Sequence, residues 1–127
     1  MSEGGAGRRD GEDEEFRARW RGREAEYLDR LRAAVTAADG DWRESLRAAA
    51  WESVHWAEAD PAGARLLTVD ALARGELGQS CQRRLTARLM AMLEGWLRES
   101  GVPSREGLAR WVLGLFYASF HRHLAVG

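Results

Sequence analysis

Apolar residues recur along this chain at the spacing of an α-helix. The first series is separated mostly by steps of three, four or seven positions, at Phe16, Trp20, Tyr27, Leu28, Leu31, Val35 and Ala38. Such spacing places the side chains on one face of a helix. Gly22 and the arginines around it weaken the first turns, so the pattern predicts a helix most clearly over residues 24–38. Asp39 and Gly40 then end it.

The second predicted helix begins after Asp41, a favourable N-terminal cap. Glu44, three residues later, completes a capping-box pattern, in which each side chain accepts a hydrogen bond from the other residue's backbone N–H. The predicted inner face comprises Trp42, Leu46, Ala49, Ser53 and Trp56. Trp51 and His55 fall on the opposite face, where they would form either an exposed interaction patch or cover for the first helix.

A third helix is predicted from Pro61 to Gly75. Asp60 is suited to cap it, and Pro61 at its first position loses no hydrogen bond. Gly75 is suited to end it. Its apolar residues are Leu66, Leu67, Val69, Leu72 and Ala73.

Two more helices complete the expected fold. The fourth covers residues 76–99, with an apolar stripe at Leu77, Cys81, Leu85, Leu89, Met92 and Trp96, widened by Met90, Leu93 and Leu97. The fifth, over residues 105–125, is apolar nearly all round in its middle, which indicates burial on several sides and favours cover by a second protein. No strand-like alternation occurs. We therefore expect an all-α fold of about five antiparallel helices.

Residues 1–15 differ from the rest of the chain. They contain four glycines, and two arginines against six acidic residues. A segment with so little to bury is expected to be a disordered acidic, glycine-rich tail. Residues 16–127 then form one helical domain. The net charge of the whole chain is −1. A net charge this small produces no overall electrostatic attraction to nucleic acid or to an anionic membrane.

Cys81 is the only cysteine, so no disulfide can form within the chain. Residues 1–15 lack the apolar run of a secretory signal. The longest apolar stretch, Trp111 to Phe120, is about half the length that spans a bilayer. We therefore expect a soluble, cytoplasmic protein that does not enter the membrane.

Histidine and acidic residues offer two possible metal motifs. Glu52 and His55 form one E-x-x-H pair, but di-iron bundles need a second such pair and two further glutamates. The chain has no second copy. His121 and His123 are two positions apart, so on a helix they point in nearly opposite directions. No metal site or cofactor is expected.

Neither the arginines nor any catalytic motif indicates a particular reaction. Four arginines at positions 17, 19, 21 and 23 could contact phosphate, but a solvated helix start beside the acidic residues 13–15 is the preferred interpretation. No serine, histidine and acid set has a recognisable catalytic context, and no glycine-rich phosphate loop occurs. We do not expect an enzyme.

Six tryptophans in 127 residues leave two interpretations of the core. Four of them lie on core-directed stripes, at Trp42, Trp56, Trp96 and Trp111. They could simply fill the core. With Met90, Met92 and Cys81 nearby, they could equally surround a pliable apolar cavity for a ligand.

Two motifs carry a family resemblance. Residues 41–48 read D-W-R-x-x-L-R-A, and residues 60–75 read D-P-x-x-A-R-L-L-x-V-x-A-L-A-x-G. Together with residues 114–127, they resemble the C-terminal regulatory domain of tetracycline-repressor-type (TetR family) transcription regulators. The resemblance covers about residues 24–125. The helix-turn-helix of that family is missing, and its members usually continue into one more helix after the position of Gly127.

The resemblance implies a domain that binds a small apolar or aromatic ligand and forms a homodimer, or a heterodimer with a related regulator. Direct DNA contact is not expected. Candidate ligand-pocket residues are Trp56, Leu66, Met92, Trp96 and Trp111. Candidate dimer-interface residues are Leu115, Phe116, Ser119, Phe120 and His123. The alternative is a helical protein-interaction module that pairs with a full-length regulator.

Overall fold

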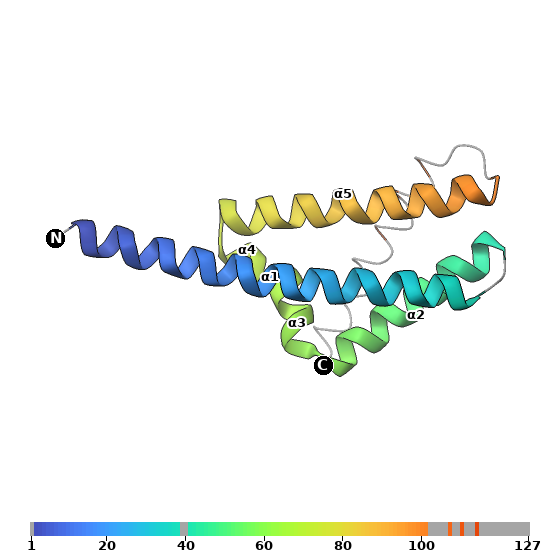
Figure 1. Ribbon diagram of the computed structural model, residues 1–127, viewed down its shortest axis with the longest axis horizontal. Coiled ribbons are helices and arrows are strands. Elements are labelled where there is room, and N and C mark those ends of the chain that lie inside the picture. Colours follow the sequence, from blue (N-terminus) through green and yellow to red (C-terminus); the bar gives the residue numbers. More distant parts are fainter. Residues whose placement is uncertain (1, 39–40, 102–106, 108–109, 111–113, 115–127) are drawn as a thin grey trace.

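The computed structural model describes residues 2–38, 41–101, 107, 110 and 114. All elements within these residues are helical, which confirms the all-α class for the described part of the chain. Four segments follow one another: α1, α2, an interrupted third segment and α5 (Figure 1). The predicted fifth helix falls almost wholly outside the described residues. None of the described helices combines the length and apolar character needed to cross a bilayer.

Helix α1 extends over Ser2–Ala38, so residues 2–15 are helical in the structure, whereas the sequence led us to expect a disordered tail over residues 1–15. Phe16 and Trp20 are each 1% exposed and anchor the helix in the core. From an anchored turn, each added residue gains a hydrogen bond without a new nucleation cost. Arg74 also reaches this part of α1, with its guanidinium 5.1 Å from the Phe16 ring centroid. The first turns project beyond the other helices (Figure 1).

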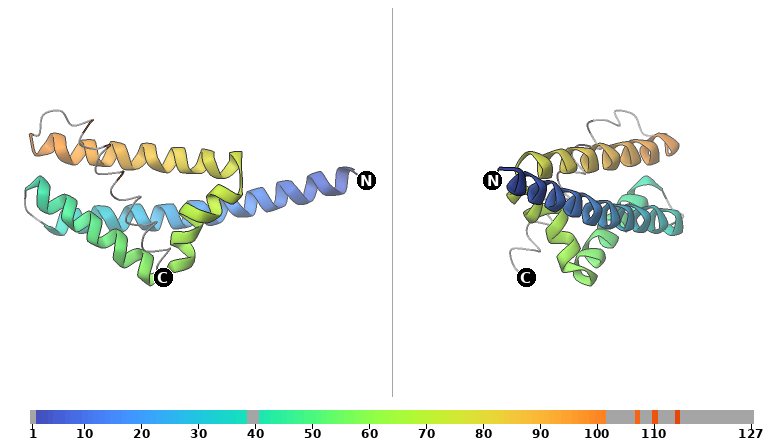
Figure 2. Two further views of the ribbon diagram at one scale, coloured as in Figure 1. Left: turned by 180° about the vertical axis from the view of Figure 1, so that it is seen from behind. Right: turned by 60° about the vertical axis from the view of Figure 1, so that its left-hand side comes forward.

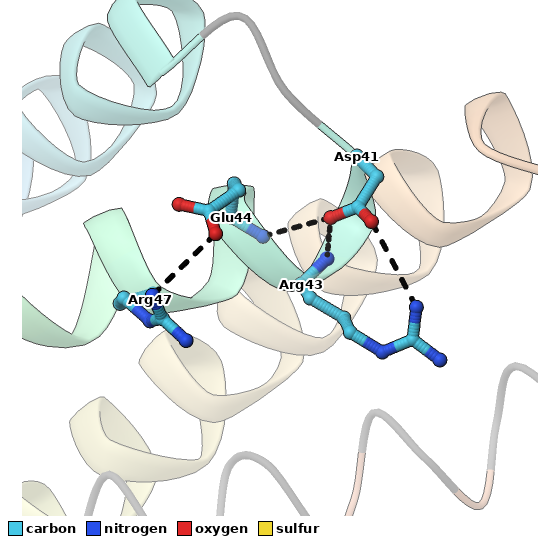
Figure 3. Close-up of polar contacts among 4 residues, drawn as sticks. All are labelled: Asp41, Arg43, Glu44 and Arg47. Atoms are coloured by element: carbon cyan, nitrogen blue, oxygen red, sulfur yellow. Dashed lines mark hydrogen bonds and ion pairs between the residues drawn. The ribbon is translucent and has the colours of Figure 1, made fainter.

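Helix α2, Trp42–Ala59, runs back along α1, and its predicted limits and inner face are largely confirmed. The Asp41 carboxylate accepts hydrogen bonds from Arg43 N at 3.0 Å and Glu44 N at 3.1 Å (Figure 3). The Glu44 carboxylate does not complete the capping box, because it faces Arg47, with Nη1 and Oε1 3.5 Å apart. The cap therefore depends on Asp41.

The third segment is less regular than predicted. It comprises α3 (Pro61–Arg65), a π-helical turn η1 (Leu66–Asp70) and α4 (Ala71–Ala73). A π-turn holds more residues than an α-turn and so rotates the following side chains around the axis. Leu66 and Leu67 are buried as expected, whereas Val69 and Leu72 are 41% and 60% exposed. The apolar residues of this segment therefore do not share one buried face.

Helix α5 covers Glu76–Glu99, as predicted, after Gly75 turns the chain with a φ of +61°. It runs in the same direction as α1, while α2 runs against both; the view from behind in Figure 2 shows the same arrangement. Its most buried apolar line is Leu85, Leu89, Leu93 and Leu97. This line meets the inner faces of α1 and α2, so the core lies among these three helices.

Candidate functional site

Trp56 lies near the end of α2 in the interior of the bundle. Its side chain is 1% exposed, and its ring lies 4.9 Å from that of Tyr27 on α1, at an interplanar angle of 40°. A tilted pair of this kind adds to the stability gained from burial alone. The pair joins α1 to α2 within the buried core.

A short chain of hydroxyl groups lies beside these rings. The Ser53 hydroxyl donates to the backbone carbonyl of Ala49 at 2.9 Å. Ser53 Oγ is also 2.8 Å from Tyr27 Oη. Since the single Ser53 proton is already directed at Ala49, Tyr27 donates to Ser53. The phenol is thereby held in one orientation.

The Trp56 indole N–H is different, since it has no hydrogen-bond acceptor among the residues that the structure describes. A buried donor without a partner costs roughly 1–3 kcal/mol. Such groups are rare in native interiors and call for an explanation in each case. Here the donor belongs to a core ring that packs against Tyr27.

The bend from α2 into α3 closes over the Trp56 ring. The Asp60 carboxylate accepts from Gly63 N at 3.1 Å and from the Arg23 guanidinium of α1. A Cβ at Gly63 would overlap this carboxylate and lie 3.2 Å from Trp56 Cζ2. The sequence indicated Asp60 as a cap, but the need for glycine at position 63 depends on the close approach of the Asp60 carboxylate, with the Trp56 ring as a second near neighbour.

The candidate pocket residues are partly brought together. Trp56 and Leu66 belong to the buried core, and Met92 and Trp96 are partly buried against the same core. Leu66 also lines an open groove of about 560 Å³ between α1 and α3. Trp111 lies outside the described residues. The same is true of the five candidate dimer-interface residues, Leu115, Phe116, Ser119, Phe120 and His123.

The same core holds a buried carboxylate that the sequence patterns did not indicate. Glu24 is 1% exposed, and its carboxylate accepts hydrogen bonds from the indole N–H of Trp20 and, at 2.6 Å, from Arg88 Nη1 of α5. The spacing of Trp20 and Glu24, four positions apart, was the available local signal. No nearby residue in the sequence indicated that Arg88 would be the second partner of Glu24.

The E-x-x-H pair does not form a common site. Glu52 lies 3.7 Å from Arg30 Nε of α1, while His55 is exposed and packs against Trp51, with ring centroids 5.7 Å apart. Within the described part of the chain, no three histidine, cysteine or acidic residues gather so as to hold a metal ion.

No protein-family model, curated protein or solved structure matches this chain.

Proposed function

We propose that this chain is a regulatory domain of the TetR type, which binds a small apolar or aromatic ligand and works as a dimer. The observation that carries the ligand-binding part is the buried Trp56 N–H, which finds no acceptor in the described part of the chain. A ligand with one acceptor atom, such as a carbonyl oxygen, would satisfy this donor. Its apolar remainder would lie among the aromatic side chains of the core.

The helices around Trp56 are suited to a regulatory response. The ring contacts α1 through Tyr27 and lies close to α3 at Gly63. A ligand that displaced the ring would shift the bend at Asp60. A ligand controls a switch when it binds one conformation of the protein more tightly than another, and here the two conformations would differ in the position of that bend.

Two matched ligands test the proposal. Acetophenone carries a carbonyl acceptor, and ethylbenzene has a similar size without one. We expect acetophenone to quench tryptophan fluorescence and raise the melting temperature, and to bind about tenfold more tightly than ethylbenzene, because only it accepts from the indole. Trp56→Phe should abolish this preference.

The matched control is Trp51→Phe, on the same helix but with a side chain that is 59% exposed. It should leave the preference for acetophenone unchanged. The proposal fails if a broad series of aromatic carbonyl compounds neither quenches fluorescence nor shifts the melting temperature. It also fails if the preference survives in Trp56→Phe.

A second candidate function, a protein-interaction module, is favoured by the exposed Trp51 ring beside His55. In this proposal the chain pairs with a full-length regulator of the same type. Light scattering of the protein alone and mixed with such a regulator tests it. A monomer that stays unchanged on mixing would refute the pairing.

A further inference from the structure

Five arginines surround one groove between the N-terminal half of α1 and the start of α5. They are Arg9, Arg17, Arg21, Arg74 and Arg84, and the groove has a volume of about 680 Å³. We call it the arginine groove. The chain as a whole carries a charge of −1, so this concentration of positive charge reflects how the fold distributes its residues.

The helical register explains why these side chains converge. Arg9, Asp13, Arg17 and Arg21 follow one another on α1 at intervals of four residues, which places them along one side of the helix. Ser80 and Arg84 are related in the same way on α5. The sequence of one helix is not enough to predict the groove, because the groove forms only where this side of α1 meets this side of α5.

Most of this positive charge is not neutralised within the described structure. Asp13 and Glu76 are the two acidic residues that line the groove. Arg74 lies 3.9 Å from Asp13, and Arg17 lies 3.0 Å from Glu14. Both pairs are solvent-accessible, and such pairs are weak enough to yield to a stronger anionic partner.

Arg9, Arg21 and Arg84 have no acidic partner among the described residues. Their guanidinium groups are exposed and free to turn toward a ligand. Arginine presents a planar set of donors that matches the geometry of phosphate and carboxylate groups.

The floor of the groove is less polar than its walls. Trp20, Leu77 and Cys81 line it, and all three are buried or half-buried. Burial raises the pKa of the Cys81 thiol despite the opposing effect of Arg84 and Arg17, so the thiol is predominantly neutral at pH 7. A ligand here meets arginine donors on the walls and a partly apolar surface below.

We propose that the arginine groove binds a small organic phosphate, with the phosphate groups on Arg21 and Arg84 and an apolar or aromatic part on the floor. A volume of about 680 Å³ fits a ligand of this size and exceeds what a bare inorganic anion fills. The site is separate from the interior around Trp56 and does not depend on the function proposed above.

A nucleic acid backbone is the competing anionic partner. Arg19 and Arg23 line a neighbouring groove together with Arg65, and Glu26 and Asp70 in that groove offset two of its three positive charges. The arginine groove holds five arginines against Asp13 and Glu76. The larger excess of positive charge therefore lies in a single groove, which favours a small ligand.

Calorimetric titration with adenosine 5′-diphosphate, and with uncharged adenosine as its matched control, tests the proposal. We expect the diphosphate to bind and adenosine to bind at least about tenfold more weakly, since charge-assisted hydrogen bonds are the stronger class. Alkylation of Cys81 by N-ethylmaleimide should slow as the diphosphate saturates the groove. This second readout locates the ligand.

Arg21→Gln combined with Arg84→Gln should weaken diphosphate binding by about tenfold or more. Arg19→Gln combined with Arg83→Gln removes the same charge from the same two helices outside the groove and should change binding by less than about twofold. Absence of diphosphate binding, or equal loss in both double variants, would overturn the proposal. So would a 20-base-pair DNA duplex that binds more tightly than the diphosphate and protects Cys81.

Discussion

At the scale of single residues, the Tyr27–Ser53 hydrogen bond is the clearest buried polar interaction between α1 and α2. We expect Tyr27→Phe and Ser53→Ala each to lower the free energy of unfolding by about 1 kcal/mol. The double variant should lose less than the sum, since both changes remove the same bond. Urea denaturation of the four proteins measures this coupling.

Exact additivity of the two changes would show that the bond contributes nothing to stability. Tyr27 also packs against Trp56, which Tyr27→Phe preserves. The change in unfolding free energy therefore reports the hydrogen bond and not the ring contact.

At the scale of elements, the tight connection between α4 and α5 requires glycine at position 78. A Cβ there would overlap the backbone carbonyl of Ala71, whereas a Cβ at Gly95 of the same helix would contact nothing within 4 Å. Gly78→Ala should destabilise the fold by about 3 kcal/mol, because backbone atoms must move apart. Gly95→Ala should stabilise it by about 0.5–1 kcal/mol through helix propensity.

Thermal unfolding of the two variants, followed by circular dichroism, measures this contrast within one helix. Gly78→Ala melting at the same temperature as the unmodified protein would contradict the close approach of α4 and α5.

At the scale of the whole molecule, Glu24 and Arg88 join the first and last described helices across 64 positions of sequence. The Glu24 carboxylate is 1% exposed, and the Arg88 side chain is 52% exposed. We expect Arg88→Ala to lower the free energy of unfolding by roughly 3 kcal/mol, because it leaves a buried carboxylate without its cation. Chemical denaturation checks the value.

The control is Arg47→Ala, which removes a partner of Glu44 on the surface of α2. Exposed pairs contribute about 0–1 kcal/mol, so this variant should be nearly neutral. Equal effects from the two arginine variants would show that Glu24 is not buried in solution as it is in the structure.

The TetR-type resemblance was carried by residues 41–48, 60–75 and 114–127, and the described residues share with it only the all-α class. The helix order α1, α2, third segment and α5 agrees with the predicted order. Ligand binding and dimerisation are the two properties that we propose for this domain. The test with Trp56→Phe addresses the first of them directly.

The sequence by itself determined where most helices begin and end. Asp41, Asp60 with Pro61, and Gly75 act through capping and backbone conformation, which depend on a few neighbouring residues. Periodicity likewise predicted which face of α2 is inward. These properties are local, so a single chain shows them without knowledge of its fold.

Only the tertiary structure decided which faces meet. It turned Val69 and Leu72 outward at η1, extended α1 through the acidic segment, paired Glu24 with Arg88 and assembled the arginine groove. The Glu24–Arg88 pair and the arginine groove depend on residues far apart in sequence. Helical periodicity specifies that a face will be covered, but the partner is chosen by packing and charge between whole helices.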